Sequence, residues 1–213
     1  MMFNVNKYRE IKDFLKKNNK NTEIIAISKN HPKNSVLEAI NAGVYIFGEN
    51  RVMEAKNKFA DLIRQFPQLQ LHLTGPLQSN KVKAAIPIFD VFHTIDREKI
   101  VNEFAKYKDQ IKEKKFFIQV NTGEEKNKSG IFPKYLKEFY EFSKKDKHMN
   151  IIGLMCIPPI DEDPKKHFSF LKTLSSNCGL NEISIGMSND FSQAIDFDPT
   201  YIRLGTILFG NRN

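Results

Sequence analysis

Short apolar runs and longer amphipathic segments alternate along the whole chain. The short runs, which are rich in β-branched and aromatic residues, are typical of buried strands. We expect eight of them, at residues 24–28, 45–47, 70–73, 91–94, 116–120, 151–156, 183–185 and 201–204. Apolar residues at helical spacing predict a leading helix at 4–17 and helices between the strands at 35–42, 51–66, 80–86, 97–107, 133–145, 164–174 and 190–195.

This regular alternation favours parallel βαβ units, and eight such units predict a (β/α)8 TIM barrel with an extra N-terminal helix. The 213 residues then form one domain, 1–213. Little chain remains after the eighth strand for a final helix, and we expect the leading helix to cover that gap. An open, doubly wound sheet is the structural alternative, because the pattern alone does not prove that the sheet closes.

Chemically distinctive residues follow directly after the expected strands. In a barrel the carboxyl ends of all strands meet on one face, where active sites form. The sequence therefore predicts one shared site. In chain order its candidates are Lys29, Gly48-Glu49-Asn50, Thr74-Gly75-Pro76, Ile95-Asp96, Asn121-Thr122-Gly123, Pro158-Pro159, Gly186-Met187-Ser188 and Gly205-Thr206.

Lys29 is the candidate for covalent chemistry. An amine at the carboxyl end of a buried strand can be desolvated, which lowers its pKa and frees a nucleophile for a carbonyl compound. The last two strands each end in a glycine and a hydroxyl residue, and the loops after these strands commonly bind phosphate in barrels. The first and last strands of a closed barrel are neighbours, so Lys29 would lie beside this phosphate site. An aldehyde that carries a phosphate satisfies both features, and pyridoxal 5'-phosphate (PLP) is the candidate cofactor.

Two further side chains belong to the candidate pocket. Arg203 shares a strand face with Gly205, and an inward arginine needs an acceptor such as a pyridine nitrogen or a carboxylate. A buried ion pair is the alternative for Arg203. His72 alternates with two leucines, as a hydrogen-bonded core histidine also does. The histidines show no metal-ligand spacing, and we predict no metal.

Charge and cysteine content narrow the function classes. The net charge of +8 and the pI of about 9.3 raise the question of nucleic acid. The lysines are scattered over every helical segment, so we expect no nucleic-acid partner. Cys156 and Cys178 are the only cysteines and form no CxxC pair, which indicates reduced thiols in the cytoplasm. The pattern shows neither a signal core nor a membrane span, and we expect no export.

Taken together, these residues resemble the YggS/PROSC family of pyridoxal-phosphate-binding proteins, also called PLP homeostasis proteins. The resemblance covers nearly the whole chain and rests on several separated motifs, of which the stretch from Gly75 to Lys81 is the most specific. The motifs are Ala26-Ile27-Ser28-Lys29, Phe47-Gly48-Glu49-Asn50, His72-Leu73-Thr74-Gly75-Pro76-Leu77-Gln78-Ser79-Asn80-Lys81, His93-Thr94-Ile95-Asp96-Arg97, Lys128-Ser129-Gly130-Ile131, Gly153-Leu154-Met155, Gly186-Met187-Ser188, Arg203-Leu204-Gly205-Thr206 and Phe209-Gly210.

The resemblance implies a monomeric barrel like the N-terminal domain of alanine racemase, with PLP held as a Schiff base. Carried over by motif, it implies that Lys29 forms the Schiff base and that Arg203 is the partner of the ring nitrogen. The remaining cofactor-binding residues are the phosphate contacts Ser188, Gly205 and Thr206, and the pocket residues Asn50, Met187 and His72.

The chain departs from the family pattern at a few positions. Asn30 and His31 replace the usual Thr-Lys after the Schiff-base lysine, which removes a neighbouring amine through which the cofactor could be exchanged. Leu71 stands where the family often has Trp, and Asn189 where it often has Asp.

An arginine opposite the ring nitrogen keeps that nitrogen unprotonated and weakens PLP as an electron sink. Racemases also need a second acid or base, commonly supplied by another domain. We therefore expect a non-catalytic carrier that stores, buffers or delivers PLP, with PLP and PLP-dependent apoenzymes as its partners. The alternatives are a PLP-dependent amino-acid racemase, a Schiff-base aldolase acting on a sugar phosphate, and a nucleic-acid-binding module.

Overall fold

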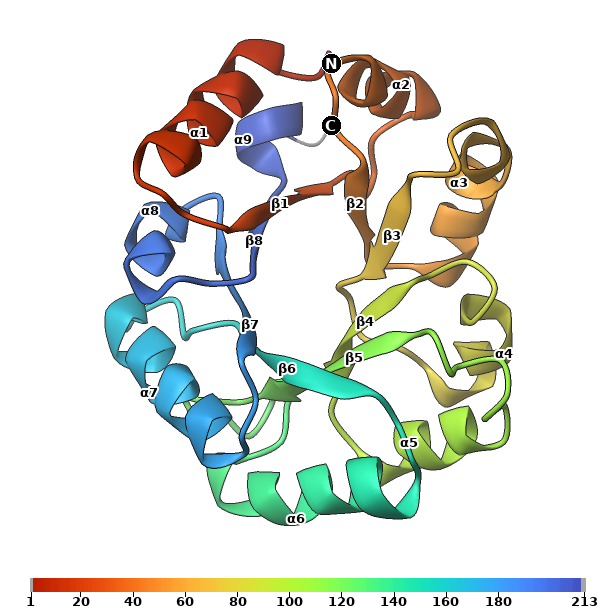
Figure 1. The fold of residues 1–213 in the computed structure, drawn as a ribbon, viewed down its shortest axis with the longest axis vertical. Helices are drawn as coiled ribbons and strands as arrows, with labels where there is room; N and C mark the ends of the chain where they lie inside the picture. The colour runs from red at the N-terminus through yellow and green to blue at the C-terminus, as the bar shows by residue number, and fades with distance from the viewer. Residues whose placement is uncertain (1, 212–213) are drawn as a thin grey trace.

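The computed structural model describes residues 2–211. Eight parallel strands close into a barrel in chain order, because β8 pairs with β1 (Figure 1). The predicted (β/α)8 barrel is confirmed, and the alternative of an open sheet is wrong. The strands are β1 (Glu23–Ile27), β2 (Ile46–Glu49), β3 (Gln70–Leu73), β4 (Val91–Ile95), β5 (Lys115–Val120), β6 (Ile151–Cys156), β7 (Glu182–Met187) and β8 (Tyr201–Leu204).

Helices surround the barrel, and a capping side chain marks where two of them begin. The Asn4 side chain accepts a hydrogen bond from the Lys7 N–H at 3.0 Å and caps the first helix. Asp163 caps the seventh helix in the same way, with Pro164 at its first position. The helices are α1 (Val5–Lys17), α2 (Lys33–Asn41), α3 (Val52–Gln65), α4 (Val82–Ala85), α5 (Glu98–Ala105), α6 (Leu136–Glu141), α7 (Pro164–Asn177), α8 (Phe191–Ala194) and α9 (Thr206–Phe209).

The first and last helices pack together where the barrel closes (Figure 1). The Phe3 ring, just before α1, lies 5.2 Å from the Phe209 ring of α9, and the Asn4 N–H donates to the Leu208 carbonyl at 2.7 Å. The leading helix α1 thus covers the part of the barrel wall at β8 and β1, where the short chain after β8 forms only a small helix. The short helix α9 itself is not predicted by the sequence pattern.

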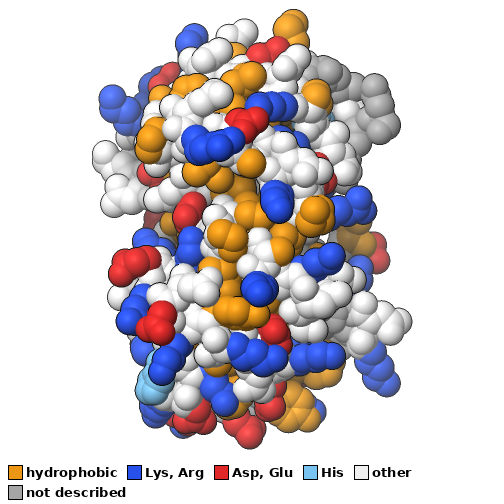
Figure 2. Space-filling model, turned by 90° about the vertical axis from the view of Figure 1, so that its right-hand side faces the viewer, with side chains coloured by type: hydrophobic (Ala, Val, Ile, Leu, Met, Phe, Trp, Pro, Cys, Tyr) orange, Lys and Arg blue, Asp and Glu red, His pale blue; other side chains and the backbone are white. Residues whose placement is uncertain are grey.

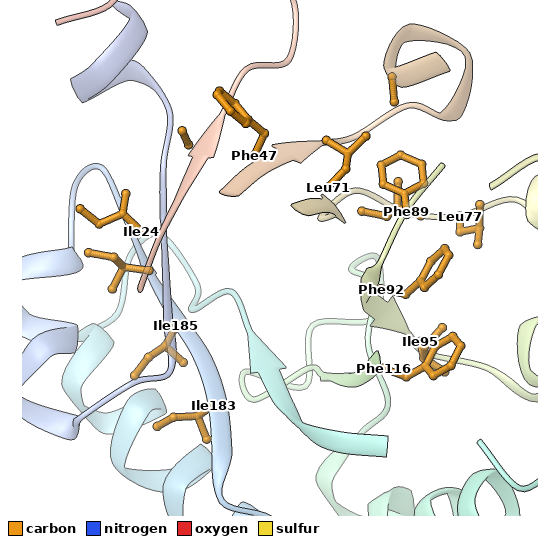
Figure 3. Packing of buried hydrophobic residues seen from close by; sticks show 14 of the residues in the cluster. Ile24, Phe47, Leu71, Leu77, Phe89, Phe92, Ile95, Phe116, Ile183 and Ile185 are labelled. Atoms are coloured by element: carbon orange, nitrogen blue, oxygen red, sulfur yellow. The ribbon is translucent and has the colours of Figure 1, made fainter. Parts of the chain in front are cut away.

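Aromatic side chains fill the layer between strands and helices. Phe92 of β4 is fully buried, and its ring centroid lies 4.8 Å from that of Phe104 in α5 and 5.3 Å from that of Phe116 in β5. The labelled strand side chains in Figure 3, such as Phe47, Phe92 and Ile183, point away from the barrel axis. A second apolar cluster fills the barrel interior, so the strands are buried on both faces. The buried residues of this second cluster are Ile25, Ile27, Val91, Phe117, Met155 and Tyr201.

The surface carries mixed charge. Lys and Arg side chains are interspersed with Asp and Glu on the face shown in Figure 2. Exposed ion pairs such as Lys106 with Glu103 are part of this pattern. Within residues 2–211, no helix combines the length and the apolar character needed to cross a bilayer.

Candidate functional site

Two adjoining cavities open where the strands end. The inner cavity, of about 250 Å³, is lined by Ile27, Lys29, Asn50, Thr74, Ile157, Met187, Ser188, Asn189, Arg203, Gly205 and Thr206. The outer cavity, of about 700 Å³, shares Asn50, Thr74, Ile157, Met187 and Asn189 with it. The two cavities therefore form one mouth at the carboxyl ends of the strands, the face where barrels carry their sites.

The structure brings seven of the eight expected site residues together around the inner cavity. They are Lys29, Asn50, Met187, Ser188, Arg203, Gly205 and Thr206. Strand pairing explains this convergence, since Ile25 of β1 is in register with Arg203 of β8, and Met187 of β7 pairs with the same arginine. The loop that carries Lys29 thus lies beside the loops after β7 and β8. That these side chains bind a ligand remains a prediction.

The loops after β7 and β8 form a pocket suited to an anion. The N–H groups of Gly205 and Ile207 both point at the Ser188 hydroxyl, with nitrogen-to-oxygen distances of 3.2 Å and 3.4 Å. Gly186, where the pairing of β7 with β8 is irregular just before this loop, has φ +84°, and a Cβ there would lie 2.7 Å from the Ala194 Cβ, so only glycine suits the position. Converging N–H groups beside the Thr206 hydroxyl provide donors for a phosphate.

Arg203 lines the inner cavity and is buried. Its Nη1 donates to the Ser184 hydroxyl at 2.8 Å, and its Nη2 donates to the Cys156 carbonyl at 2.9 Å. Burial lowers the pKa of Arg203, while Cys156 and Asp190 oppose this effect. An arginine remains charged in proteins and offers only donors, so any ligand atom that it contacts must be an acceptor.

His72, the eighth expected residue, lies apart from the seven, inside the barrel. It is fully buried, and its Nδ1 is 3.0 Å from the His93 Nε2. The His93 Nδ1 is in turn 3.1 Å from the Ser184 hydroxyl, which accepts from Arg203. Because arginine only donates, the Ser184 proton is available to His93, and the chain of bonds runs in one direction from Arg203 to His72. His72 Nε2 has no partner among the described residues.

Three further residues line the inner cavity but are not among the eight expected cofactor-binding residues. Thr74, directly after β3, is one of the strand-end candidates, whereas Ile157 and Asn189, in the loops after β6 and β7, are not. The signal that would have found them is their position alone, since all strand ends meet at this face. Among residues 2–211, no three His, Cys, Asp or Glu side chains are grouped as metal ligands.

The chain is thus a closed parallel (β/α)8 barrel whose mouth gathers a lysine, an arginine and the N–H and hydroxyl groups of two loops. The family model described as "Alanine racemase, N-terminal domain" matches residues 5–213. The structure of PipY from Synechococcus elongatus PCC7942 without PLP is similar, with a TM-score of 0.88 and 32% identity, and covers 97% of this chain and 99% of PipY. The structure of PipY with PLP bound has a TM-score of 0.83 and 31% identity, with the same coverage.

Two curated relatives carry the same name. The pyridoxal phosphate homeostasis protein of Aquifex aeolicus (strain VF5) is 35% identical over 201 residues, which are 89% of this chain and 87% of the relative. That of Vibrio cholerae serotype O1 is 37% identical over 202 residues, or 90% of this chain and 86% of the relative. The chain belongs to the family of pyridoxal phosphate homeostasis proteins, which has the alanine racemase N-terminal fold. The family resemblance seen in the sequence is confirmed.

Proposed function

We propose that this protein binds PLP at the inner cavity as a Schiff base on Lys29 and serves to store and deliver it. One observation carries the proposal: an amine, a donor-only arginine and an anion pocket line the same cavity of about 250 Å³. These three groups fit the aldehyde, the ring nitrogen and the phosphate of one PLP molecule. The relatives named as PLP homeostasis proteins, and PipY with PLP bound, support this assignment.

The residues divide the work of binding. The Gly205 and Ile207 N–H groups, with the Ser188 and Thr206 hydroxyls, would hold the phosphate. Asn50 and Met187 line the same cavity and would contact the ring, and Arg203 would donate to its nitrogen. PLP supplies an electron sink when its ring nitrogen is protonated. Arg203 disfavours that protonated form, because a protonated pyridine nitrogen has no lone pair with which to accept a hydrogen bond from the arginine.

The outer cavity also argues for storage over turnover of amino acids. Of the described residues that line it, Lys128 is the one cation, against the carboxylates Glu125, Glu162 and Asp190. An α-carboxylate substrate is best held by a bidentate arginine, and this lining offers none.

Turnover is the test that separates carrier from enzyme. The PLP-loaded protein is incubated separately with L-alanine and D-alanine, beside an equal concentration of free PLP. We expect no racemisation above that of free PLP, and transfer of PLP to an apoenzyme that regains activity. Sustained racemisation would establish the racemase alternative, which the family match makes the second candidate.

The same proposal extends to the state of the protein in the cell. We infer a cytoplasmic monomer, consistent with Cys156 and Cys178, which form no disulfide. Light scattering during gel filtration at cellular concentrations tests the monomer, and a dimeric mass would reject it.

A further inference from the structure

Three charged side chains form a cluster behind Lys29, on the outer side of the barrel wall. Ile46 faces the barrel interior, so by strand alternation Glu49 points outward to α3, where Glu54 and Lys58 lie one turn apart. The Lys58 Nζ is 2.7 Å from Glu49 Oε1 and 3.0 Å from Glu54 Oε1. We call these three residues the rear cluster.

The rear cluster is buried to an extent that is unusual for charged groups. Lys58 is 8% exposed and Glu49 is fully buried. Burial raises the pKa of Glu49, while Lys58 and the Ser28 hydroxyl oppose this effect. Burying charges is costly, and replacing a buried ion pair by apolar residues is often neutral or stabilising, so such a pair is weak evidence for a stabilising role. In this protein the rear cluster holds the backbone on either side of Lys29.

All three members of the cluster bind the peptide groups or side chains directly flanking Lys29. Lys58 Nζ donates to the Ser28 carbonyl at 2.7 Å, and the Ser28 hydroxyl donates to Glu49 Oε1 at 2.7 Å. On the other side, the Asn30 N–H donates to Glu54 Oε1 at 2.5 Å. The backbone before and after Lys29 is therefore tied to one buried group of charges.

Asn30 adds a reason for this tie. Its φ is +62°, in the left-handed region that non-glycine residues adopt at a cost. The bond from the Asn30 N–H to Glu54 stabilises that conformation. Without it the chain after Lys29 has an easier extended alternative, and the Lys29 side chain would leave from a different direction.

We propose that the rear cluster positions Lys29, so that its amine meets the aldehyde of a ligand whose phosphate is already bound. The inference rests on the proposed function. Glu49, Glu54 and Lys58 are positioning residues, because they act on the backbone of Lys29 and not on the ligand. Their loss affects the covalent bond and leaves phosphate binding intact.

Glu54 is the residue to change, because its side chain is 22% exposed and its loss leaves no fully buried charge without a partner. Two ligands are compared: PLP, and pyridoxine 5'-phosphate, which has an alcohol in place of the aldehyde and forms no imine. We expect Glu54→Ala to weaken PLP binding about tenfold, the effect of losing one hydrogen bond to a charged group. Binding of pyridoxine 5'-phosphate should stay within about twofold.

Two variants serve as controls. Glu54→Gln keeps an acceptor for the Asn30 N–H and should restore most of the PLP affinity. Glu103→Ala removes the exposed pair with Lys106 and should change neither ligand's affinity. Lys58→Met is a second test of the cluster, provided that its thermal unfolding shows a folded protein.

The outcomes are distinct. Equal weakening of both ligands by Glu54→Ala would show a structural role, and unchanged binding of both would show none; either result overturns the proposal. Absence of any borohydride-reducible bond in the wild-type protein would instead refute the proposed function itself.

Discussion

The two histidines inside the barrel should lower the stability of the protein in mild acid. Burial, and to a lesser extent the charge of Lys115, lowers the pKa of His72 to about 3. Burial also lowers the pKa of His93 well below its usual range, with further contributions from His72 and Arg203. Both histidines therefore stay neutral in the folded protein while an unfolded chain takes up protons below about pH 6.5.

The sign and the size of the effect follow from this difference. Because the folded pKa is depressed, stability is greatest above pH 6.5 and falls as the unfolded state gains protons that the folded state does not. For one such histidine the loss from pH 7 to pH 5 is about 2 kcal/mol, and for both about 4 kcal/mol. For His72 the loss continues down to about pH 3, where the folded protein also takes up a proton.

Urea unfolding at pH 7 and pH 5 measures the effect, and His72→Gln isolates it. A glutamine at this position can still accept from the His93 Nε2, which lies 3.0 Å from the His72 ring. It does not titrate, so the difference in unfolding free energy between the two pH values should shrink by about 2 kcal/mol. An unchanged pH dependence in His72→Gln would refute the buried, neutral state of this histidine.

Three further predictions concern packing and the cavity. Phe92→Ala should lower the unfolding free energy by about 3 to 5 kcal/mol in urea, because it empties a fully buried aromatic site; a loss under about 1 kcal/mol would contradict the described packing. Gly75→Ala would place a Cβ 2.6 Å from the Cα and carbonyl oxygen of Asn50. This substitution should lower the unfolding free energy, measured in urea, by about 1 to 3 kcal/mol, and it should weaken PLP binding, measured by titration. If neither quantity changes, the close approach of Gly75 to Asn50 is contradicted. Ser188→Ala should weaken PLP about tenfold but not pyridoxal, which lacks the phosphate, and equal losses in equilibrium titration would reject the phosphate assignment.

The sequence pattern predicts the barrel well because every strand is buried on both faces and reads as a compact apolar run. The expected strands 70–73, 151–156 and 201–204 agree with β3, β6 and β8 at both ends. β7 extends from Glu182 to Met187, beyond the expected 183–185. Its ends contain a charged residue and a glycine, which the apolar pattern does not mark as strand, and backbone pairing with β6 and β8 extends the strand over them. Helix α9 has four residues, too few to show a helical period.

The sequence predicts that the candidate site lies where the strand ends meet. It does not predict how far along the barrel axis, from the interior to the mouth, each inward side chain lies. Alternation places His72 on the inner face of β3 and does not say whether it reaches the mouth or the interior. The pairing of His72 with His93, and of His93 with Ser184, depends on strand register, which the pattern leaves undefined.

The rear cluster was missed although a signal was present. Lys58 lies three residues after Ala55 and four before Leu62, so it falls on the buried face of α3. A lysine on the apolar face of a helix indicates a buried partner. The identity of that partner, Glu49 on a neighbouring strand, is a tertiary contact that helical spacing cannot supply.

The covalent assignment of Lys29 has one direct test. The protein is mixed with PLP, reduced with borohydride and digested, and mass spectrometry locates the added group; Lys29→Ala is treated in parallel and its visible absorption is recorded. We predict the modification on Lys29 and a variant without the imine absorption. A modified residue elsewhere in the wild-type protein, or an unchanged imine absorption in Lys29→Ala, would contradict the account.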